Sequence, residues 1–283
     1  MSSNGSTQTT PFGRETRPFD GKRVINFFKE GHVGVVEIDD PPANTYTHEM
    51  MRQLDEAILD ARFDEDVEVI LITGKGEKFF SAGANIAMLN SVTPEFKYMF
   101  CLHANETLSR LEQTPKLVIA ALNGHCVGGG LEIAMAADIR IARKDAGKVG
   151  LPEVTLGVLP GTGGTTRLAK MVGKSKAIEL MVTGNTFSFE EAADLGLVNQ
   201  VIDATADEWW EQVMDYARQF VVPNKSSLAV GKVKRAIQTG LELSLPDGLA
   251  FERELLAQTF GSEDGQEGVK AYLEKRTAQF KGK

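Results

Sequence analysis

The segment LVIAALNGHCVGGGLE, residues 117–132, combines the features of a strand, a turn and the start of a helix. Its first six residues are all apolar, which is typical of a strand buried on both faces of a parallel sheet. Asn123-Gly124 ends that strand. Three glycines at 128–130 then precede an apolar stretch that carries Glu132. The pattern predicts a glycine loop at a strand end, where backbone amides can approach a ligand closely.

Strands and helices alternate on either side of this segment. Thr47 and Thr93-Pro94 are typical helix starts. Further strands are predicted over 33–38, 67–72 and 138–141. The alternation favours an α/β core, and helical patterns dominate the last part of the chain.

This organisation divides the chain into three parts. We predict a flexible N-terminal tail over 1–20, an α/β core over 21–206 and a C-terminal helical region over 207–283. The helical region is too thin for an independent catalytic domain. We therefore expect it to pack on the core or on a neighbouring subunit. We expect one core to leave an apolar face of this region uncovered, with Leu249, Leu255, Leu256 and Phe260 on it.

The composition excludes several classes of protein. Of the 283 residues, 42% are hydrophobic and 25% are charged, which argues against a disordered or fibrous chain. The net charge of −8 disfavours binding to nucleic acid or to anionic membranes. Any anionic ligand must therefore be held by local donors.

The chain carries no pattern typical of export or membrane insertion. No stretch is long and apolar enough to cross a bilayer, and the first ten residues lack the features of a signal peptide. The two cysteines, Cys101 and Cys126, form no CxxC motif and are expected to be thiols in a reducing compartment. We expect a cytoplasmic protein.

Several well-known motifs begin in this sequence but remain incomplete. His48-Glu49 would open an HExxH zinc site, but Arg52 stands at the second histidine position. The glycine-rich stretch 161–166 lacks the last glycine of a dinucleotide turn. No GxSxG segment is present. We predict neither a metal site nor a nucleotide cofactor.

Three loops remain as candidates for a functional site. They cover 80–86, 123–132 and 150–164. The first two offer small residues that leave backbone N–H groups uncovered, and together such loops form an oxyanion hole. Glu132 and Glu153 would then suit proton transfer beside a polarised carbonyl. Spacing alone leaves open whether they meet or serve as ordinary turns and caps.

Taken together, these loops resemble the crotonase superfamily, the enoyl-CoA hydratase/isomerase family. The resemblance extends from about Val24 to the C-terminus. It rests on residues 80–86, 121–124, 128–132, 151–153, 157–165, 191–198 and 272–276.

The resemblance implies a spiral of ββα units followed by C-terminal helices that mediate trimerisation. It implies a homotrimer or, as a dimer of trimers, a homohexamer. The implied substrate is an acyl-CoA thioester of the kind found in fatty acid metabolism. No cofactor is implied, because coenzyme A is part of the substrate.

The resemblance also assigns roles to residues. The amides of Ala84 and Gly129 form the oxyanion hole, Glu132 activates water, Glu153 protonates the α carbon, and the amide of Gly161 places the water. We expect Gly129 to be sensitive to substitution, because its missing Cβ keeps the approach to the ligand open. The residues implied to contact CoA or substrate are Ala82, Ala84, Asn85, Ile86, Gly129 and Lys275.

Three positions depart from the family pattern. Asn85 stands where many members have Asp, and Leu151 stands where Gln is frequent. Ala87 replaces a lysine that lies near the CoA phosphate in many hydratases. Lys275 resembles a family lysine that reaches CoA across a subunit interface, and could serve instead. We interpret these departures as variation in affinity and substrate.

The presence of both acids favours an enoyl-CoA hydratase, a carbon–oxygen lyase. An enoyl-CoA isomerase remains the alternative, because family isomerases can work with one acid at the Glu153 position. A non-catalytic acyl-CoA-binding subunit and a Clp-type serine protease are less favoured. Residues 86–111 are expected to line the acyl pocket, with Met88, Leu89, Phe96, Met99 and Phe100 as candidates.

Overall fold

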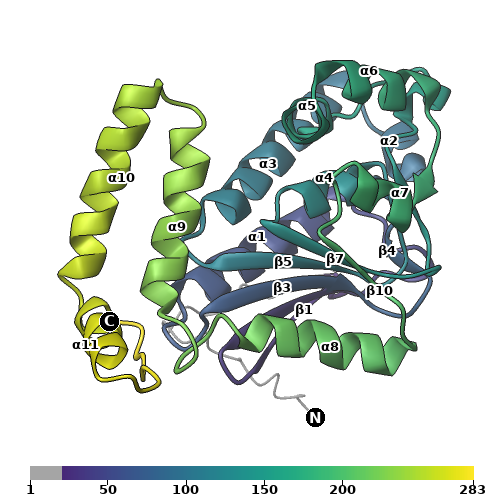
Figure 1. Ribbon diagram of the computed structural model, residues 1–283. Coiled ribbons are helices and arrows are strands. Elements are labelled where there is room, and N and C mark those ends of the chain that lie inside the picture. The colour runs from purple at the N-terminus through teal and green to yellow at the C-terminus, as the bar shows by residue number, and fades with distance from the viewer. Residues whose placement is uncertain (1–20) are drawn as a thin grey trace, which may run out of the picture.

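The computed structural model describes residues 21–283 (Figure 1). The tail predicted over 1–20 lies outside the described residues.

Three successive turns of the chain each contribute a strand to a large sheet, a short strand to a small sheet, and then a helical segment. The first turn is β3 (Val69–Gly74), β4 (Phe79–Ser81), α2 (Ile86–Ser91) and α3 (Pro94–Gln113). The second is β5 (Leu117–Leu122), β6 (His125–Val127) and α4 (Gly129–Met135). The third is β7 (Ile139–Arg143), β8 (Lys148–Gly150), the 3₁₀ helix η1 (Glu153–Leu156) and α5 (Gly164–Val172).

Other elements precede and follow these turns. Before them come β1 (Ile25–Glu30), β2 (Val33–Ile38) and α1 (His48–Phe63). After them come α6 (Lys174–Thr183), β9 (Phe187–Ser188), α7 (Phe189–Asp194) and β10 (Gln200–Ile202). The last helices are α8 (Ala206–Arg218), α9 (Ser227–Gly240), α10 (Leu245–Phe260) and α11 (Glu263–Leu273). The predicted α/β spiral of strand pairs and helices is confirmed.

The large sheet has the order β1-β2-β3-β5-β7-β10, and only β1 runs antiparallel to its neighbour. The small sheet has the order β4-β6-β8-β9. The strand predicted over 67–72 starts at Val69 instead, because β3 pairs along the full length of β2, from Val33 with Val69 to Ile38 with Gly74. The partner strand, rather than the apolar run, sets where β3 begins and ends.

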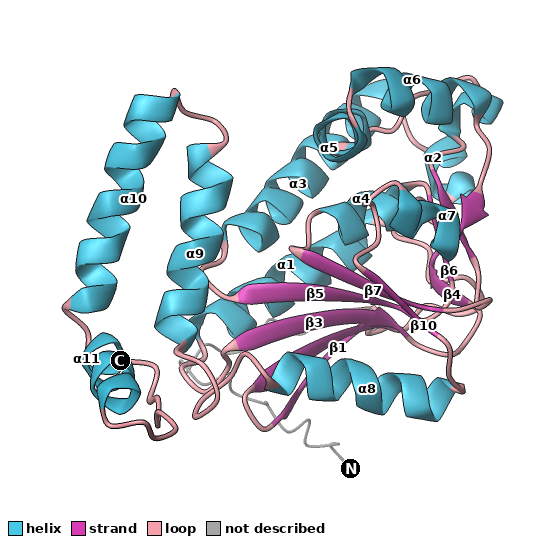
Figure 2. Ribbon diagram, in the orientation of Figure 1, coloured by secondary structure: helices cyan, strands magenta, loops and turns pink. Residues whose placement is uncertain are grey.

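Each face of the large sheet is covered by a different layer (Figure 2). Val35, Leu71 and Ile119 share a core with Trp209 and other apolar side chains of α8. The alternate strand residues face a second core, shared with α1, α3 and α4. Burial on both faces explains why β3 and β5 are continuous apolar runs.

The predicted helix starts are confirmed by their caps. The Thr47 hydroxyl accepts a hydrogen bond from Met50 N at 3.2 Å at the start of α1. The Thr93 hydroxyl accepts from Phe96 N at 3.2 Å, and Pro94 occupies the first turn of α3. These caps satisfy amides that have no partner inside the helix.

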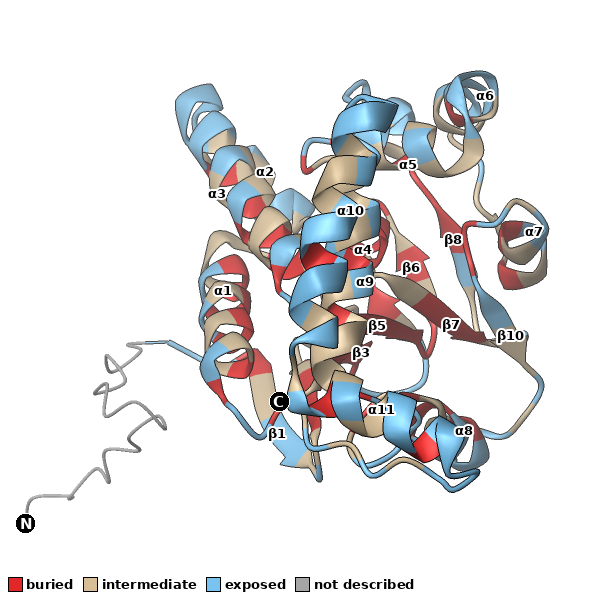
Figure 3. Ribbon diagram, turned by 60° about the vertical axis from the view of Figure 1, so that its left-hand side comes forward, coloured by how far each residue is buried: buried red, intermediate tan, exposed pale blue. Residues whose placement is uncertain are grey.

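The C-terminal region is helical, as predicted. Its first helix, α8, packs on the large sheet, whereas α9 and α10 form a hairpin beside the core (Figure 1). Figure 3 shows that much of α10 is exposed. Leu249, Leu256 and Phe260 are among its exposed side chains. Leu255, which we expected to lie on the same uncovered face, is instead buried. The boundary at residues 206 and 207 stays a prediction.

No helix within residues 21–283 is both long enough and apolar enough to cross a membrane.

A buried amide joins the two sheets. The Asn123 side chain donates to the carbonyls of Gly76 and Phe79 at 2.7 and 3.2 Å, and accepts from Gly74 N at 3.1 Å. It therefore fixes the passage from β3 to β4, which carries the chain towards the first candidate loop.

Replacement of Asn123 by Ala should leave several of these backbone groups unpaired inside the protein. We expect the free energy of unfolding to fall by about 3 kcal/mol. Urea denaturation measures it. The exposed Asn90→Ala variant is the control, and equal stability of the two variants would contradict this role for Asn123.

Candidate active site

The first two candidate loops touch through glycine backbone. A Cβ atom on Gly83 would lie 2.8 Å from Gly129 N, and one on Gly130 would lie 2.3 Å from the Ser81 carbonyl oxygen. Gly83 also has φ = +83°, a conformation that favours glycine. The loop after β4 and the start of α4 therefore come this close only because neither carries a side chain at the contact.

The amides of Ala84 and Gly129 lie on either side of this contact. In residues 21–283 neither N–H donates a hydrogen bond to a protein group. Ala84 lies between two backbone bonds of its neighbours: Tyr46 N donates to Gly83 O at 2.9 Å, and Asn85 N donates to Tyr46 O at 3.0 Å. Both amides therefore remain available as donors.

The space beside Gly129 is filled by an aromatic ring. A Cβ atom on Gly129 would lie 1.9 Å from Tyr46 Cε1 and 2.4 Å from its hydroxyl oxygen. We expected the missing Cβ to leave room for a ligand. The structure corrects this reason: Gly129 is required because Tyr46 packs against it.

Glu132 lies in the first turn of α4 and is almost fully buried. Its Oε1 accepts hydrogen bonds from Thr162 N and Gly164 N, both at 2.8 Å, and its Oε2 is hydrogen-bonded to the Thr162 hydroxyl. The third candidate loop thus clamps this carboxylate. Both oxygens have a fixed orientation.

Glu153 begins η1 and points at the same glycine loop. A Cβ atom on Gly128 would lie 3.0 Å from Glu153 Oε1, so the bend at Gly128, with φ = +56°, leaves this carboxyl its space. Glu153 Oε2 is buried and makes no hydrogen bond among the described residues. Burial raises the pKa of Glu153 to about 7, and the charge of Glu132 adds to the increase. Such a group can hold or release a proton near neutral pH.

Gly161 borders the site from the third loop. Asn105 donates to the Gly161 carbonyl at 3.4 Å, and a Cβ atom on Gly161 would lie 3.0 Å from Cys101 Sγ. Burial raises the pKa of the Cys101 thiol, and Glu132 contributes to the increase. The role of the Gly161 amide stays a prediction.

The residues expected to contact CoA lie on two separate parts of the chain. Ala82, Asn85 and Ile86 form the end of the first loop, where the Asn85 side chain accepts from Met88 N at 2.9 Å and caps α2. Lys275 is exposed just after α11, which Figure 1 shows well apart from α4. Within one chain these contacts do not meet, so a contribution of Lys275 would require a second subunit.

Some of the candidate acyl-pocket residues are buried in the core, and others are exposed to solvent. Met88 and Leu89 pack partly buried against the core, whereas Phe96 and Met99 are exposed. Phe100 is buried, with its ring centroid 5.6 Å from that of Tyr46. Phe100 therefore supports Tyr46 from within the core.

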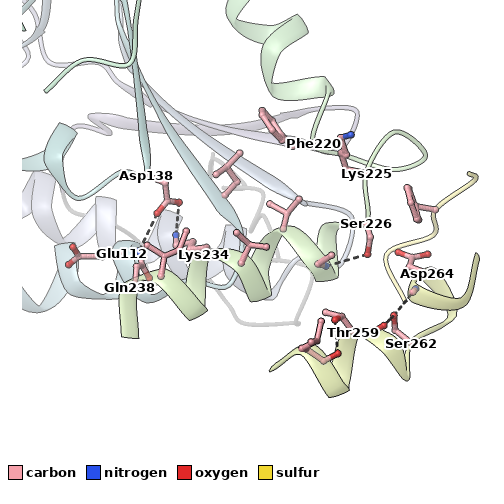
Figure 4. A pocket seen from close by; sticks show the side chains of 18 of the residues that line it. Glu112, Asp138, Phe220, Lys225, Ser226, Lys234, Gln238, Thr259, Ser262 and Asp264 are labelled. Atoms are coloured by element: carbon pink, nitrogen blue, oxygen red, sulfur yellow. Dashed lines mark hydrogen bonds and ion pairs between the residues drawn. The ribbon is translucent and has the colours of Figure 1, made fainter. Parts of the chain in front are cut away.

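A separate cavity of about 970 Å³ lies between α9, α10, α11 and the core (Figure 4). Its walls are largely apolar, and an ion pair of Lys234 with Asp138, at 2.8 Å, lies at one end. It contains neither candidate acid. We assign the chemistry to the glycine loops, because the oriented carboxylates and free amides are there.

The described residues contain no group of three or more His, Cys, Asp or Glu side chains arranged to hold a metal ion. The expectation that no metal takes part stays a prediction.

Two polar residues of the site were not singled out by sequence reasoning. Tyr46 lies in none of the three candidate loops, and Thr162 lies in the third loop without a role of its own. Their side chains meet Gly129 and Glu132 through the fold. No spacing rule pairs residues so far apart in the chain.

Comparison with known proteins shows the family of the chain. A family model described as enoyl-CoA hydratase/isomerase matches residues 29–283. The short-chain-enoyl-CoA hydratase of Clostridium acetobutylicum is 38% identical over 251 residues, which cover 88% of this chain and 94% of that protein. A crystal structure of an enoyl-CoA hydratase from Geobacillus kaustophilus HTA426 has a TM-score of 0.89 and 43% identity, covering 93% of this chain and 98% of that one.

The spiral of strand–strand–helix turns, which this chain shares with solved enoyl-CoA hydratases, is the crotonase class of fold. The chain belongs to the enoyl-CoA hydratase/isomerase family.

Because the pKa of Glu153 is raised, we predict that the stability of the folded protein depends on pH. A carboxyl whose pKa rises from 4.5 to about 7 on folding stabilises the protein fully below pH 4.5 and loses that contribution as the pH rises through 7. Glu153→Gln cannot ionise, so its melting temperature relative to wild type should be higher at pH 8 than at pH 5. The control is Glu65→Gln, at an exposed site. A difference for Glu153→Gln that does not change with pH would refute the assignment.

Proposed function

We propose that this protein catalyses the reversible addition of water to the double bond of a 2-enoyl-CoA thioester, and so acts as a carbon–oxygen lyase. The observation that carries the proposal is the approach of two carboxylates, the buried Glu132 and the half-buried Glu153, to one glycine loop from different elements. The similarity to the Clostridium acetobutylicum short-chain-enoyl-CoA hydratase supports it.

The proposed roles follow from the state of each group. Glu132, a carboxylate held by N–H donors, takes a proton from water as the water oxygen bonds to C3. The electron pair of the C2=C3 double bond then forms a double bond between C1 and C2, and the carbonyl pair moves onto the thioester oxygen. The amides of Ala84 and Gly129 stabilise the resulting enolate. Glu153 then gives its proton to C2. The product is a 3-hydroxyacyl-CoA, and atoms and charge balance.

Substrate binding is assigned to the edges of the same site. We place Ala82, Asn85 and Ile86 beside CoA, and Gly161 N–H beside the attacking water. Lys275 of a neighbouring subunit would replace the phosphate contact that Ala87 cannot make. No cofactor beyond the CoA of the substrate is needed for these steps.

One observation favours isomerisation of the double bond as a second candidate. The hydrogen bonds from Thr162 and Gly164 already occupy both Glu132 oxygens, whereas Glu153 Oε2 has no partner among the described residues. Glu153 alone would then move a proton between two carbons. Mass spectrometry of the products distinguishes the two reactions: hydration of a 2-enoyl-CoA adds one water, and isomerisation of a 3-enoyl-CoA leaves the mass unchanged.

We further propose a homotrimer or homohexamer in the cytoplasm. Leu249, Leu256 and Phe260 expose apolar surface on α10 that a second copy would cover. Both described cysteines are free, as suits a reducing compartment.

The proposed mechanism predicts the effect of neutralising each acid. Glu132→Gln and Glu153→Gln should each slow hydration of crotonyl-CoA by roughly a hundredfold or more, the usual range for positioned acid–base groups. Glu65→Gln is the control. Near wild-type turnover in either variant would remove that acid from the mechanism. A wild-type protein that binds acyl-CoA without converting it would indicate a binding subunit.

The assembly is tested by light scattering at micromolar concentration. We expect the mass of three or six chains. Replacing Leu256 and Phe260 together by Ser should lower that mass, because the apolar contact is lost. A monomer mass for the wild-type chain would contradict the proposed assembly.

A further inference from the structure

The loop that holds Glu132 is itself held by an arginine. Arg167 lies in α5, and its Nη1 donates a hydrogen bond back to the Thr162 carbonyl at 3.2 Å. Gly163 has φ = +104°, and a Cβ atom on it would overlap the Arg167 guanidinium. The missing side chain at Gly163 therefore lets the guanidinium lie against the loop backbone.

The other nitrogen of the guanidinium is fixed to α3. Arg167 Nη2 donates to Glu112 Oε2 at 2.9 Å, and only 13% of the Arg167 side chain is exposed. Asn105, seven residues before Glu112 and so on the same side of α3, donates to the Gly161 carbonyl at 3.4 Å. The peptides on either side of Thr162 are thus both anchored to α3, one directly and the other through Arg167.

These anchors act on the peptides that orient the acid. Thr162 N and Gly164 N each donate to Glu132 Oε1 at 2.8 Å. The bond from Arg167 restrains the planar peptide that joins Thr162 to Gly163. This peptide sets the direction in which the chain continues to Gly164. If it turned, the N–H groups on both sides of it would move relative to Glu132 Oε1.

The stability of α5 does not explain an arginine at this position. Arg167 is the fourth residue of the helix, where the helix dipole disfavours a positive charge. Its Nε is buried and has no hydrogen-bond partner among residues 21–283, which is a further cost. An arginine placed at such cost serves contacts outside its own helix, and the contacts present are those to the loop and to α3.

We propose that Arg167 is a positioning residue of the hydration reaction, which orients the Glu132 carboxylate by joining the loop at Thr162 to Glu112 on α3. This role rests on the proposed hydration. A general base takes a proton from water efficiently only when its oxygen keeps a set direction to that water. Arg167 contacts no reacting atom in this role and acts only through the loop backbone.

The first test is Arg167→Met, which keeps an unbranched apolar side chain and removes the donors. We expect kcat for crotonyl-CoA hydration to fall roughly tenfold, the rate equivalent of one hydrogen bond. KM should stay within about twofold of wild type, because the amides proposed to hold the thioester lie in other loops. The control is Arg23→Met, at an exposed site just before β1, which should leave kcat and KM unchanged.

The pH dependence of kcat distinguishes a positioning role from a merely structural one. In the proposed reaction Glu132 must be ionised and Glu153 must carry a proton, so the two acids limit the rate at low and at high pH respectively. Weaker N–H bonds stabilise the ionised Glu132 less. The acidic limb of Arg167→Met should therefore move to higher pH by roughly half a unit, while the alkaline limb stays. A merely structural arginine would lower the melting temperature and leave both limbs in place.

Three other titratable groups sense the charge of Glu132. Burial raises the pKa of Glu153, Cys101 and Tyr46, and the charge of Glu132 contributes to each increase. All three are retained in the Arg167 variants, so a shift of the acidic limb alone reports on Glu132.

A second variant separates the bridge from the charge. Arg167→Lys keeps the positive charge but loses the planar fork that joins two acceptors. We expect it to show the lower kcat and the shifted acidic limb as well. Wild-type kcat and pH dependence in Arg167→Lys would show that the charge alone suffices, and would overturn the bridging role.

A double-mutant cycle tests the anchor on α3. Glu112→Ala should slow hydration roughly threefold, because Arg167 loses the partner that fixes it. If Glu112 acts through Arg167, the double variant Glu112→Ala/Arg167→Met should be no slower than Arg167→Met alone. Losses that multiply would overturn the connection to α3.

The results distinguish the role of Arg167 from the function on which it rests. Failure of the wild-type protein to hydrate any 2-enoyl-CoA overturns the proposed function, and the role of Arg167 falls with it. Hydration by wild type together with an unchanged kcat in Arg167→Met overturns only the role of Arg167. If Arg167→Met does not fold, Glu112→Ala decides instead, because an unchanged kcat and acidic limb in that variant would overturn the role.

Discussion

The site depends on the close approach of two backbones, the loop after β4 and the start of α4. Gly83, Gly129 and Gly130 have no Cβ atoms at this contact, and each Cβ would lie within 3 Å of a neighbouring atom. Among residues 21–283, the Ala84 and Gly129 amides beside this contact donate to no protein group. Parallel strand pairs hold the contact, since β4 pairs with β6 in the small sheet and β3 pairs with β5 in the large sheet.

The two acids beside this contact, Glu132 and Glu153, lie in different surroundings. Glu132 sits inside the fold and is held by the loop that leads into α5, so its charge is stabilised by N–H donors. Glu153 enters from η1, has an oxygen with no hydrogen-bond partner within residues 21–283, and is kept partly neutral by burial. Two carboxyl groups in unlike surroundings are suited to unlike tasks, one taking a proton while the other gives one.

The C-terminal helices contribute little to this site within one chain. The α9–α10 hairpin leaves apolar side chains exposed and encloses a cavity against the core (Figure 4). Lys275 follows α11, far from the glycine loops of its own chain (Figure 1). These features connect substrate binding to assembly in the proposed function, because a neighbouring copy would both cover the helices and supply a lysine.

The sequence by itself determined the elements whose cause is local. Apolar runs predicted β3 and β5, and threonine caps predicted the starts of α1 and α3. The glycines at 128–130 predicted the loop that precedes Glu132. Only the tertiary structure decided where β3 begins and that Leu255 is buried. It also decided that the Tyr46 ring fills the space beside Gly129, where we expected room for a ligand. It also decided the raised pKa of Glu153. Each of these depends on atoms that are distant in the chain, and no local pattern records the burial or contact that folding creates.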